Sequence, residues 1–241
     1  MSITNVLMER IDAIDPGTIF TYNDLKISSE NRALIIATLG RLAAKGIIRR
    51  FAKGKYYKPK QGLFGEVSLM ESQMLESFLK ENGNWVGYVT GARAYNSIGL
   101  NAHISKEYVI ATAKLRRPFE RDRFKARFVK SYCLIEEKYV RLLRFLDAVK
   151  DFNKIIGTSI NRAVKFFKIK LKRLSRIEIN KLIQFAMNYP PYTRALLGAM
   201  IELTSNSKMA IKLYKSLNTK SSYKLNIGPE LLPNRTKWRI R

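Results

Sequence analysis

The first sixty residues begin with hydrophobic side chains spaced as in short helices. Apolar residues recur every three or four positions from Ile3 to Ile14, and Asp15-Pro16-Gly17 interrupts the pattern. Thr18-Ile19-Phe20 has the composition of a short strand. Residues 21–25 begin with a threonine that can cap one or two helical turns. The pattern therefore predicts a helix, a short strand and a second, shorter helix.

A third helix and a hairpin are predicted next. Ser28-Ser29 is a capping pair, and the apolar positions after it follow helical spacing until Lys45-Gly46, where the glycine suits a left-handed cap. Residues 47–51 and 55–58 are strand-like and flank the turn Ala52-Lys53-Gly54. Two such strands around a glycine-containing turn predict a basic β-hairpin, which Pro59 closes.

Helix, short strand, helix, helix and basic hairpin is the order of a winged helix-turn-helix, so we expect residues 1–60 to form a DNA-binding domain. The positively charged hairpin favours DNA over the alternative, a winged helix used for protein contact. The third helix and the wing supply donors and acceptors for base edges and cations for phosphates. The residues expected to contact DNA are Ser29, Asn31, Arg32, Arg41, Lys45, Arg49, Arg50, Lys53 and Lys55.

Residues 61–241 are expected to form a second, larger domain of α+β class. Tyr108–Thr112, Phe124–Val129 and Tyr132–Ile135 are predicted strands, and Thr90 is predicted to cap a helix rich in small residues. From Glu137 onward the spacing is mostly helical. The fold class expected for the whole chain is α+β, with an N-terminal winged helix-turn-helix and a mixed domain that has small strands to about residue 136 and a helical C-terminal part.

The charge of the 241-residue chain favours a polyanionic partner. It has 45 lysines and arginines against 19 acidic residues, a net charge of +26. Such an excess attracts nucleic acid, and counterion release from phosphates favours binding. Residues 146–241 alone carry 20 basic and 5 acidic side chains. The basic helix predicted at 161–174 is either a solvated face or a second polyanion-binding surface. In the basic tail, Trp238 is expected to dock on the protein body in preference to stacking on a base.

Several classes of function are disfavoured by residue types that are rare. Cys133 and His103 are the sole cysteine and histidine, so we expect no disulfide, no metal site and no cofactor. Gly157-Thr158-Ser159 lacks the aspartate pair that a nucleotidyltransferase would need, and we expect no catalytic residues. The apolar stretches are too short to cross a membrane, and the first residues lack the pattern of a leader, so a cytoplasmic protein without a membrane partner is expected.

Three segments resemble one known family. The wing segment Gly46–Tyr57, the small-residue segment Gly91–Leu100 and the segment Tyr189–Gly198 are similar to parts of AbiEi-type antitoxins of bacterial type IV toxin–antitoxin systems. The resemblance implies a winged helix that represses its own operon by binding inverted repeats in double-stranded DNA. It also implies a larger α+β domain that counters a nucleotidyltransferase-type toxin. No catalytic residues are carried over from it.

Three alternatives to the antitoxin remain open at the level of sequence, one of them a protein-interaction module whose second domain holds an acidic partner. Relatives of this kind also occur as orphan transcriptional regulators without a toxin partner. An RNA-binding protein would also suit the net charge of +26 and the aromatic content of 11%. A preference for duplex DNA would distinguish the winged helix from the RNA-binding alternative, because side chains cannot read the deep, narrow major groove of A-form RNA.

Overall fold

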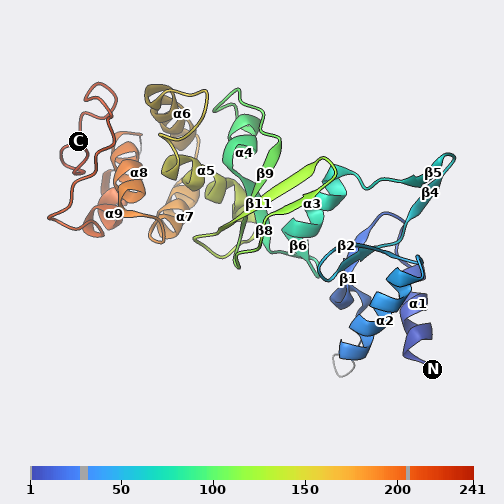
Figure 1. The fold of residues 1–241 in the computed structure, drawn as a ribbon. Helices are drawn as coiled ribbons and strands as arrows, with labels where there is room; N and C mark the ends of the chain where they lie inside the picture. The colour runs from blue at the N-terminus through green and yellow to red at the C-terminus, as the bar shows by residue number, and fades with distance from the viewer. Residues whose placement is uncertain (1, 28–31, 205–206) are drawn as a thin grey trace. The chain divides into compact units, whose positions relative to one another are not determined.

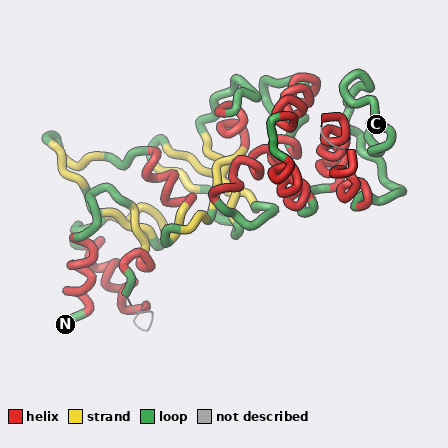
Figure 2. Tube along the Cα trace, turned by 180° about the vertical axis from the view of Figure 1, so that it is seen from behind, coloured by secondary structure: helices red, strands yellow, loops and turns green. Residues whose placement is uncertain are grey.

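The computed structural model describes residues 2–27, 32–204 and 207–241. The chain folds into two compact units, residues 1–86 and 87–241 (Figure 1). Both units combine helices with small sheets, as the trace in Figure 2 shows, so the α+β class is correct. Among the described residues, no helix has both the length and the apolar character that a membrane span requires.

The first unit follows the predicted order of elements as far as the hairpin and then continues. It contains, in chain order, α1 (Ile3–Asp12), β1 (Ile19–Thr21), the 3₁₀ turn η1 (Tyr22–Leu25), α2 (Arg32–Ala44), β2 (Arg49–Ala52), β3 (Lys55–Tyr57), β4 (Lys60–Gly62), β5 (Gly65–Val67), α3 (Glu71–Leu79), β6 (Lys80–Glu81) and β7 (Asn84–Trp85).

Local chemistry explains where these elements begin and end. The Ser2 hydroxyl accepts a hydrogen bond from the backbone N–H of Asn5, which caps α1. Gly46 adopts a φ of +76° just after α2, and Gly54 adopts +72° in the turn between β2 and β3. A residue with a Cβ is strained at such angles, so glycine favours both turns. The predicted helix stop and the predicted hairpin are confirmed.

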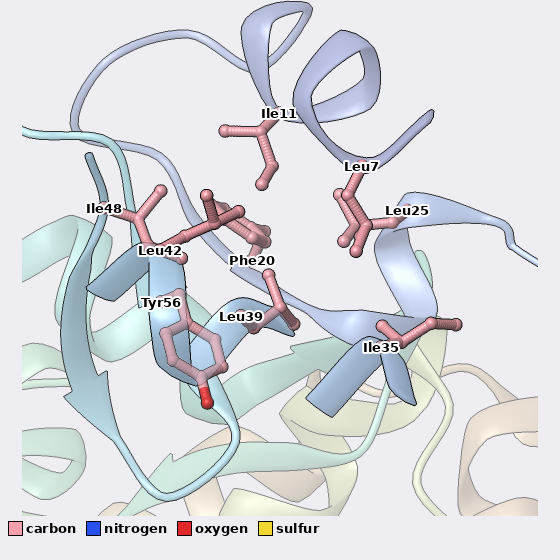
Figure 3. Packing of buried hydrophobic residues seen from close by; sticks show 9 residues of the cluster. All are labelled: Leu7, Ile11, Phe20, Leu25, Ile35, Leu39, Leu42, Ile48 and Tyr56. Carbon is pink, nitrogen blue, oxygen red and sulfur yellow. The ribbon is translucent and has the colours of Figure 1, made fainter. Parts of the chain in front are cut away.

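One hydrophobic core joins the helices to the sheet of the first unit. The sheet has the antiparallel order β1-β3-β2. One side chain from each layer illustrates the packing: Ile11 of α1, Leu39 of α2 and Phe20 of β1 are almost completely buried. The whole cluster, drawn in Figure 3, consists of Leu7, Ile11, Phe20, Leu25, Ile35, Leu39, Leu42, Ile48 and Tyr56.

The first unit extends beyond the boundary at residue 60 that the sequence suggested. Phe78 of α3 packs against Phe51 of β2, with ring centroids 5.8 Å apart. The hydroxyl of Tyr57 donates a hydrogen bond of 3.2 Å to Glu66 of β5. Because these contacts join residues 61–86 to the preceding sheet, the first compact unit ends at Val86. The tip of the β4–β5 hairpin carries Leu63 and Phe64, both fully exposed.

The second unit starts with a sheet and continues with helices. It contains β8 (Gly87–Thr90), α4 (Gly91–Ser97), β9 (Glu107–Thr112), β10 (Phe119–Arg121), β11 (Phe124–Lys130), the 3₁₀ turn η3 (Glu137–Tyr139), α5 (Val140–Lys150), α6 (Ile160–Lys172), α7 (Arg176–Ala186), α8 (Pro191–Thr204), η4 (Ser207–Ala210) and α9 (Ile211–Lys215). The sheet order is β10-β11-β9-β8, with β9 and β11 parallel and the other pairs antiparallel.

One predicted strand of this unit is wrong. Tyr132–Ile135 forms bends and loop, not a strand. The Ser131 hydroxyl donates a hydrogen bond to the carbonyl oxygen of Cys133 and accepts one from its backbone N–H, so the backbone turns at this point. The Tyr132 ring stacks on Tyr189 with ring centroids 4.5 Å apart. A side chain that bonds the local backbone offers an alternative to strand pairing. The strands predicted at Tyr108–Thr112 and Phe124–Val129 correspond to β9 and β11.

The C-terminal tail docks on the helical part of the second unit, as predicted for Trp238. The Trp238 side chain is 1% exposed, and its indole N–H donates a hydrogen bond of 2.7 Å to Glu202 of α8. Its ring lies against Gly198, where a Cβ would meet the ring at 2.1 Å. A glycine in this helix therefore makes room for the tryptophan.

Candidate nucleic-acid interface and the Asp147 cluster

Arg32 stands at the start of α2, as the sequence predicted, and its position is held by an aromatic ring. Its guanidinium lies 4.7 Å from the ring centroid of Tyr22 in η1, which is cation–π distance. The Arg32 side chain is exposed. Ser29 and Asn31, the other predicted contacts at this end, lie outside the described residues.

The solvent-facing side of α2 is largely apolar, which was not predicted from the sequence. Leu34 and Ile36 are each 45% exposed, and the small residues Ala33, Ala37 and Gly40 are exposed beside them. Apolar side chains can touch thymine methyl groups in a major groove, but they can equally cover a protein surface. Among the described residues of α2, the charged side chains are those of Arg32 and Arg41, which lie toward the two ends of the helix.

Cations gather at the C-terminal end of α2 and on the β2–β3 hairpin. The Arg41 guanidinium donates to the Thr38 hydroxyl at 2.9 Å, and Lys45 is exposed beyond it. On the hairpin, Arg50 and Lys53 are exposed, the latter in the turn. These positions are accessible to a phosphate backbone.

Arg49 is partly neutralised, which the sequence did not indicate. Its Nε lies 3.3 Å from a carboxylate oxygen of Glu66 in β5, and half of its side chain remains exposed. The same carboxylate accepts the hydrogen bond from Tyr57. Glu66 therefore competes with any external anion for the charge of Arg49.

Lys55 does not lie on this surface, which corrects its predicted role. The residue is 6% exposed, and its ammonium donates a hydrogen bond of 2.6 Å to the carbonyl oxygen of Ser77 in α3. A carboxylate oxygen of Glu81 lies 4.0 Å away. The ammonium therefore joins the hairpin to α3 and is not accessible to a phosphate.

The basic excess is concentrated in the second unit. Residues 1–86 carry 12 basic and 9 acidic side chains, net +3, whereas residues 87–241 carry 33 and 10, net +23. In the first unit the acidic residues are unevenly placed, because 61–86 alone has four of them and one lysine. The hairpin and the end of α2 thus form a local positive surface, while the second unit is basic throughout.

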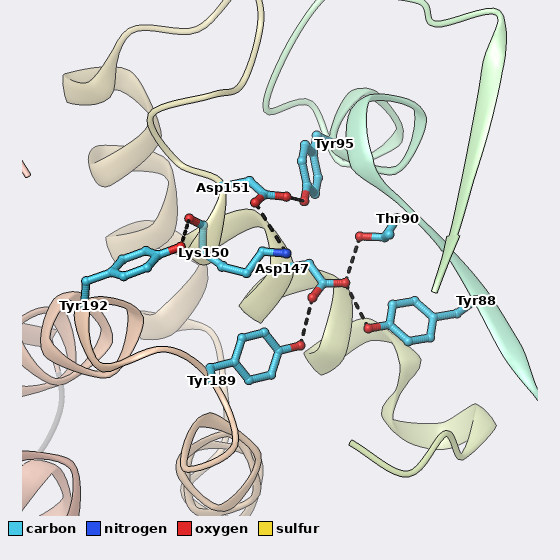
Figure 4. Close-up of polar contacts among 8 residues, drawn as sticks. All are labelled: Tyr88, Thr90, Tyr95, Asp147, Lys150, Asp151, Tyr189 and Tyr192. Atoms are coloured by element: carbon cyan, nitrogen blue, oxygen red, sulfur yellow. Dashed lines mark hydrogen bonds and ion pairs between the residues drawn. The ribbon is translucent and has the colours of Figure 1, made fainter. Parts of the chain in front are cut away.

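A buried carboxylate forms the main polar cluster of the second unit (Figure 4). Asp147 of α5 is 4% exposed. One of its oxygens accepts hydrogen bonds from the hydroxyls of Tyr88, at 2.9 Å, and Thr90, at 2.8 Å. The other accepts one from Tyr189 at 2.9 Å. These bonds join β8, α5 and the segment between α7 and α8, and the hydroxyl of Thr90 is thereby used for the cluster and not for capping α4.

The electrostatics of the cluster follow from its burial. Burial raises the pKa of Asp147 above its ordinary value, and Lys150 and the three hydroxyls offset only part of that effect. Burial also raises the pKa of Tyr88 and of Tyr189. These hydroxyls are therefore protonated donors at neutral pH, which suits them to hold the carboxylate.

A second, shallower group of side chains adjoins the Asp147 cluster. The Tyr95 hydroxyl donates a hydrogen bond of 2.9 Å to Asp151, and the Lys150 ammonium lies 3.4 Å from the same carboxylate (Figure 4). Neither group of side chains was predicted from the sequence. One signal was present: Asp147 stands between Leu143, Leu146 and Val149 on the apolar side of a predicted helix. An acidic residue there needs buried partners.

The described residues show no group of three or more His, Cys, Asp or Glu side chains arranged to hold a metal ion. Asp147 has both oxygens occupied by hydroxyl donors, so its evident role is to join three elements. Tyr95 and Asp151 extend this bonding toward α4. The polar clusters therefore order the second unit, and the exposed cations offer contacts to anions.

Comparisons with known proteins find little resemblance at the level of sequence. No family model matches the chain, and no curated protein matches it. Among solved structures, the crystal structure of the Rv2827c protein from Mycobacterium tuberculosis is similar with a TM-score of 0.45 and 11% sequence identity. The similarity covers 91% of this chain and 82% of that one.

Proposed function

We propose that this chain is a sequence-specific DNA-binding regulator of the antitoxin type, whose first unit contains a winged helix-turn-helix. The observation that carries the proposal is the packing of α1, η1 and α2 on the three-stranded sheet β1-β3-β2, with a cationic turn between β2 and β3. This order of elements is that of a winged helix, in which the helix before the hairpin enters the major groove.

In this proposal the two ends of α2 and the hairpin contact different parts of the DNA. Arg32 reaches a base edge, where an arginine reads guanine, and small apolar residues of α2 face the groove. Arg41 and Lys45 bind flanking phosphates. Arg50 and Lys53 bind phosphates from the wing, and Arg49 contributes with a charge that Glu66 partly neutralises. Lys55 is left out because it is buried.

The antitoxin part of the proposal is supported by the sequence resemblance and by the presence of a second compact unit. Of the three resembling segments, Gly91–Leu100 contains α4 and Tyr189–Gly198 contains the first half of α8. Both lie in the second unit, to which we assign the activity against a nucleotidyltransferase-type toxin. Neither segment carries a catalytic set, so the proposed action is binding and not catalysis.

The DNA-binding proposal is tested by footprinting the full-length protein on the DNA upstream of its own gene. Protection of inverted repeats is expected, and the double variant Arg50→Ala/Lys53→Ala should weaken it at least tenfold. Arg10→Ala, which removes an exposed cation from α1, is the control for loss of charge. If the double variant protects the same site at the same concentration, the hairpin does not contact DNA.

The antitoxin proposal needs a separate test. Co-expression with a nucleotidyltransferase encoded beside this gene should restore growth, and the Arg50→Ala/Lys53→Ala protein should restore it equally well because the second unit is unchanged. Failure of both proteins to restore growth, when both are folded and abundant, would leave an orphan regulator.

Binding of RNA by the second unit is the second candidate function. The observation that favours it is the net charge of +23 on residues 87–241, against +3 on residues 1–86. Full-length protein that binds single-stranded RNA more tightly than the upstream duplex, with the same affinity after the hairpin substitutions, would support this candidate against the first.

A further inference from the structure

A cleft of about 390 Å³ opens in the second unit beside the Asp147 cluster. One wall is the face of the sheet that carries Val109 and Ala111 of β9 and Val129 of β11. The start of α4 and the C-terminal end of α5, with Asp147, Lys150 and Asp151, form the other sides. A volume of this size is within the range of small-molecule sites, which combine apolar walls with a few polar groups.

Asn101 is the unusual residue of this cleft. It is 5% exposed, and among the described residues neither its side-chain nitrogen nor its side-chain oxygen has a hydrogen-bond partner. Its backbone is fixed, because its carbonyl accepts a hydrogen bond of 3.1 Å from Asn96. Buried amides are normally bonded. A residue held in this way offers one donor group and one acceptor to a ligand in the cleft.

Four of the charged side chains that line the cleft form two ion pairs. Arg127 lies 3.3 Å from Glu107, and Lys150 lies 3.4 Å from Asp151, so these four side chains neutralise one another in pairs.

Lys130 and Lys154 also line the cleft. Neither makes an ion pair within the described part of the chain. Set against the Asp147 carboxylate, which also lines the cleft, the two ammonium groups leave one net positive charge, and a phosphomonoester near neutral pH carries between one and two negative charges.

We propose that this cleft binds a small phosphomonoester, with Lys130 and Lys154 on the phosphate and the Asn101 amide on a polar group of the organic part. The apolar sheet face accommodates that organic part. The phosphate can belong to a free metabolite or to the end of a nucleic-acid strand, since both present the same group. The inference does not rest on DNA binding by the first unit.

The test is calorimetric titration of the full-length protein with inorganic phosphate, ribose 5-phosphate and adenosine monophosphate. At least one organic phosphate should bind at least tenfold more tightly than inorganic phosphate, because Asn101 and the sheet face add contacts. The variant Lys130→Ala/Lys154→Ala should weaken that binding at least tenfold. Lys212→Ala/Lys215→Ala removes the same charge from exposed positions on α9 and should leave it unchanged.

Asn101→Asp and Asn101→Leu test the amide itself. Both should reduce the preference for the organic phosphate over inorganic phosphate. If either variant fails to fold, as circular dichroism would show, the Lys130→Ala/Lys154→Ala variant provides the test. Both lysines are exposed, so their substitution should leave the fold intact.

A matched pair of oligonucleotides, with and without a 5′-phosphate, separates the two sources of the group. Binding that needs the 5′-phosphate and the two lysines assigns the cleft to strand ends. Absence of binding by every phosphomonoester, or equal loss in the α9 control, overturns the proposal.

Discussion

The ammonium of Lys55 lies 2.6 Å from the carbonyl oxygen of Ser77, 22 residues later in the chain. Lys53, two residues before it, is exposed in the turn of the hairpin. Two lysines that look equivalent in the sequence therefore have different environments. One joins the hairpin to α3, and the other is available to a phosphate.

Substitution of Lys53 should weaken DNA binding, whereas substitution of Lys55 should lower the stability of the folded protein. Lys53→Ala should reduce the slope of log affinity for duplex DNA against log salt by about one, with little change in stability. Lys55→Met should lower the free energy of unfolding by roughly 1–3 kcal/mol, because the Ser77 carbonyl loses its partner. Salt titrations and urea unfolding measure the two effects. Equal losses of slope in both variants would place Lys55 on the DNA.

Arg32→Ala should reduce specificity more than general affinity. Tyr22 holds the guanidinium at the start of α2, and an arginine contact with guanine is worth roughly 1–3 kcal/mol. The affinity for the operator should fall accordingly, while the affinity for random DNA changes little. Competition binding assays with both DNAs measure this, with Arg10→Ala as the control. Equal losses on both DNAs would reassign Arg32 to a phosphate.

Asp147 should make stability depend on pH. Burial raises its pKa in the folded protein, so the folded state binds the proton more tightly than the unfolded state does. This contribution to stability is complete below about pH 4, the ordinary pKa of an aspartate, and is lost as the pH rises through the folded-state pKa.

Asp147→Asn removes this titration. Relative to the variant, the wild-type protein should lose unfolding free energy as the pH rises from about 4, the ordinary aspartate pKa, through the folded-state pKa. Urea unfolding at several pH values measures the difference, and Asp12→Asn, at an exposed position in α1, is the control. A difference that is constant with pH would show that the carboxyl does not titrate abnormally.

Substitution of two helical glycines by alanine should change the stability of the protein in opposite directions. At Gly198 a Cβ would lie 2.1 Å from the ring of Trp238, so Gly198→Ala should destabilise the protein by roughly 1–3 kcal/mol through overpacking. At Gly40 an added Cβ would point into open space, so Gly40→Ala should stabilise the protein by about 0.5–1 kcal/mol. Thermal unfolding measures both. A stabilised Gly198→Ala protein would mean that the tryptophan is not docked on α8.

The amino-acid sequence by itself determined several local elements of this protein, although not the segment Tyr132–Ile135. The stop at Gly46, the turn at Gly54 and the break before α8 at Pro191 follow from backbone preferences of single residues. The apolar spacing of α1 and α2 places Ile11 and Leu39 in the core, because helical periodicity fixes which side chains share a face. These features need no knowledge of distant contacts.

Only the tertiary structure decided which polar side chains are buried and what they bond. The partners of Asp147 lie 42 to 59 residues away, and those of Lys55 come from an element after the predicted boundary. The spacing of apolar residues predicts which face of a strand or helix a side chain lies on, but it does not predict which other segment packs against that face. Burial and charge compensation depend on contacts between distant segments, so the boundary after Val86 and the cleft at Asn101 emerge only when the chain is folded.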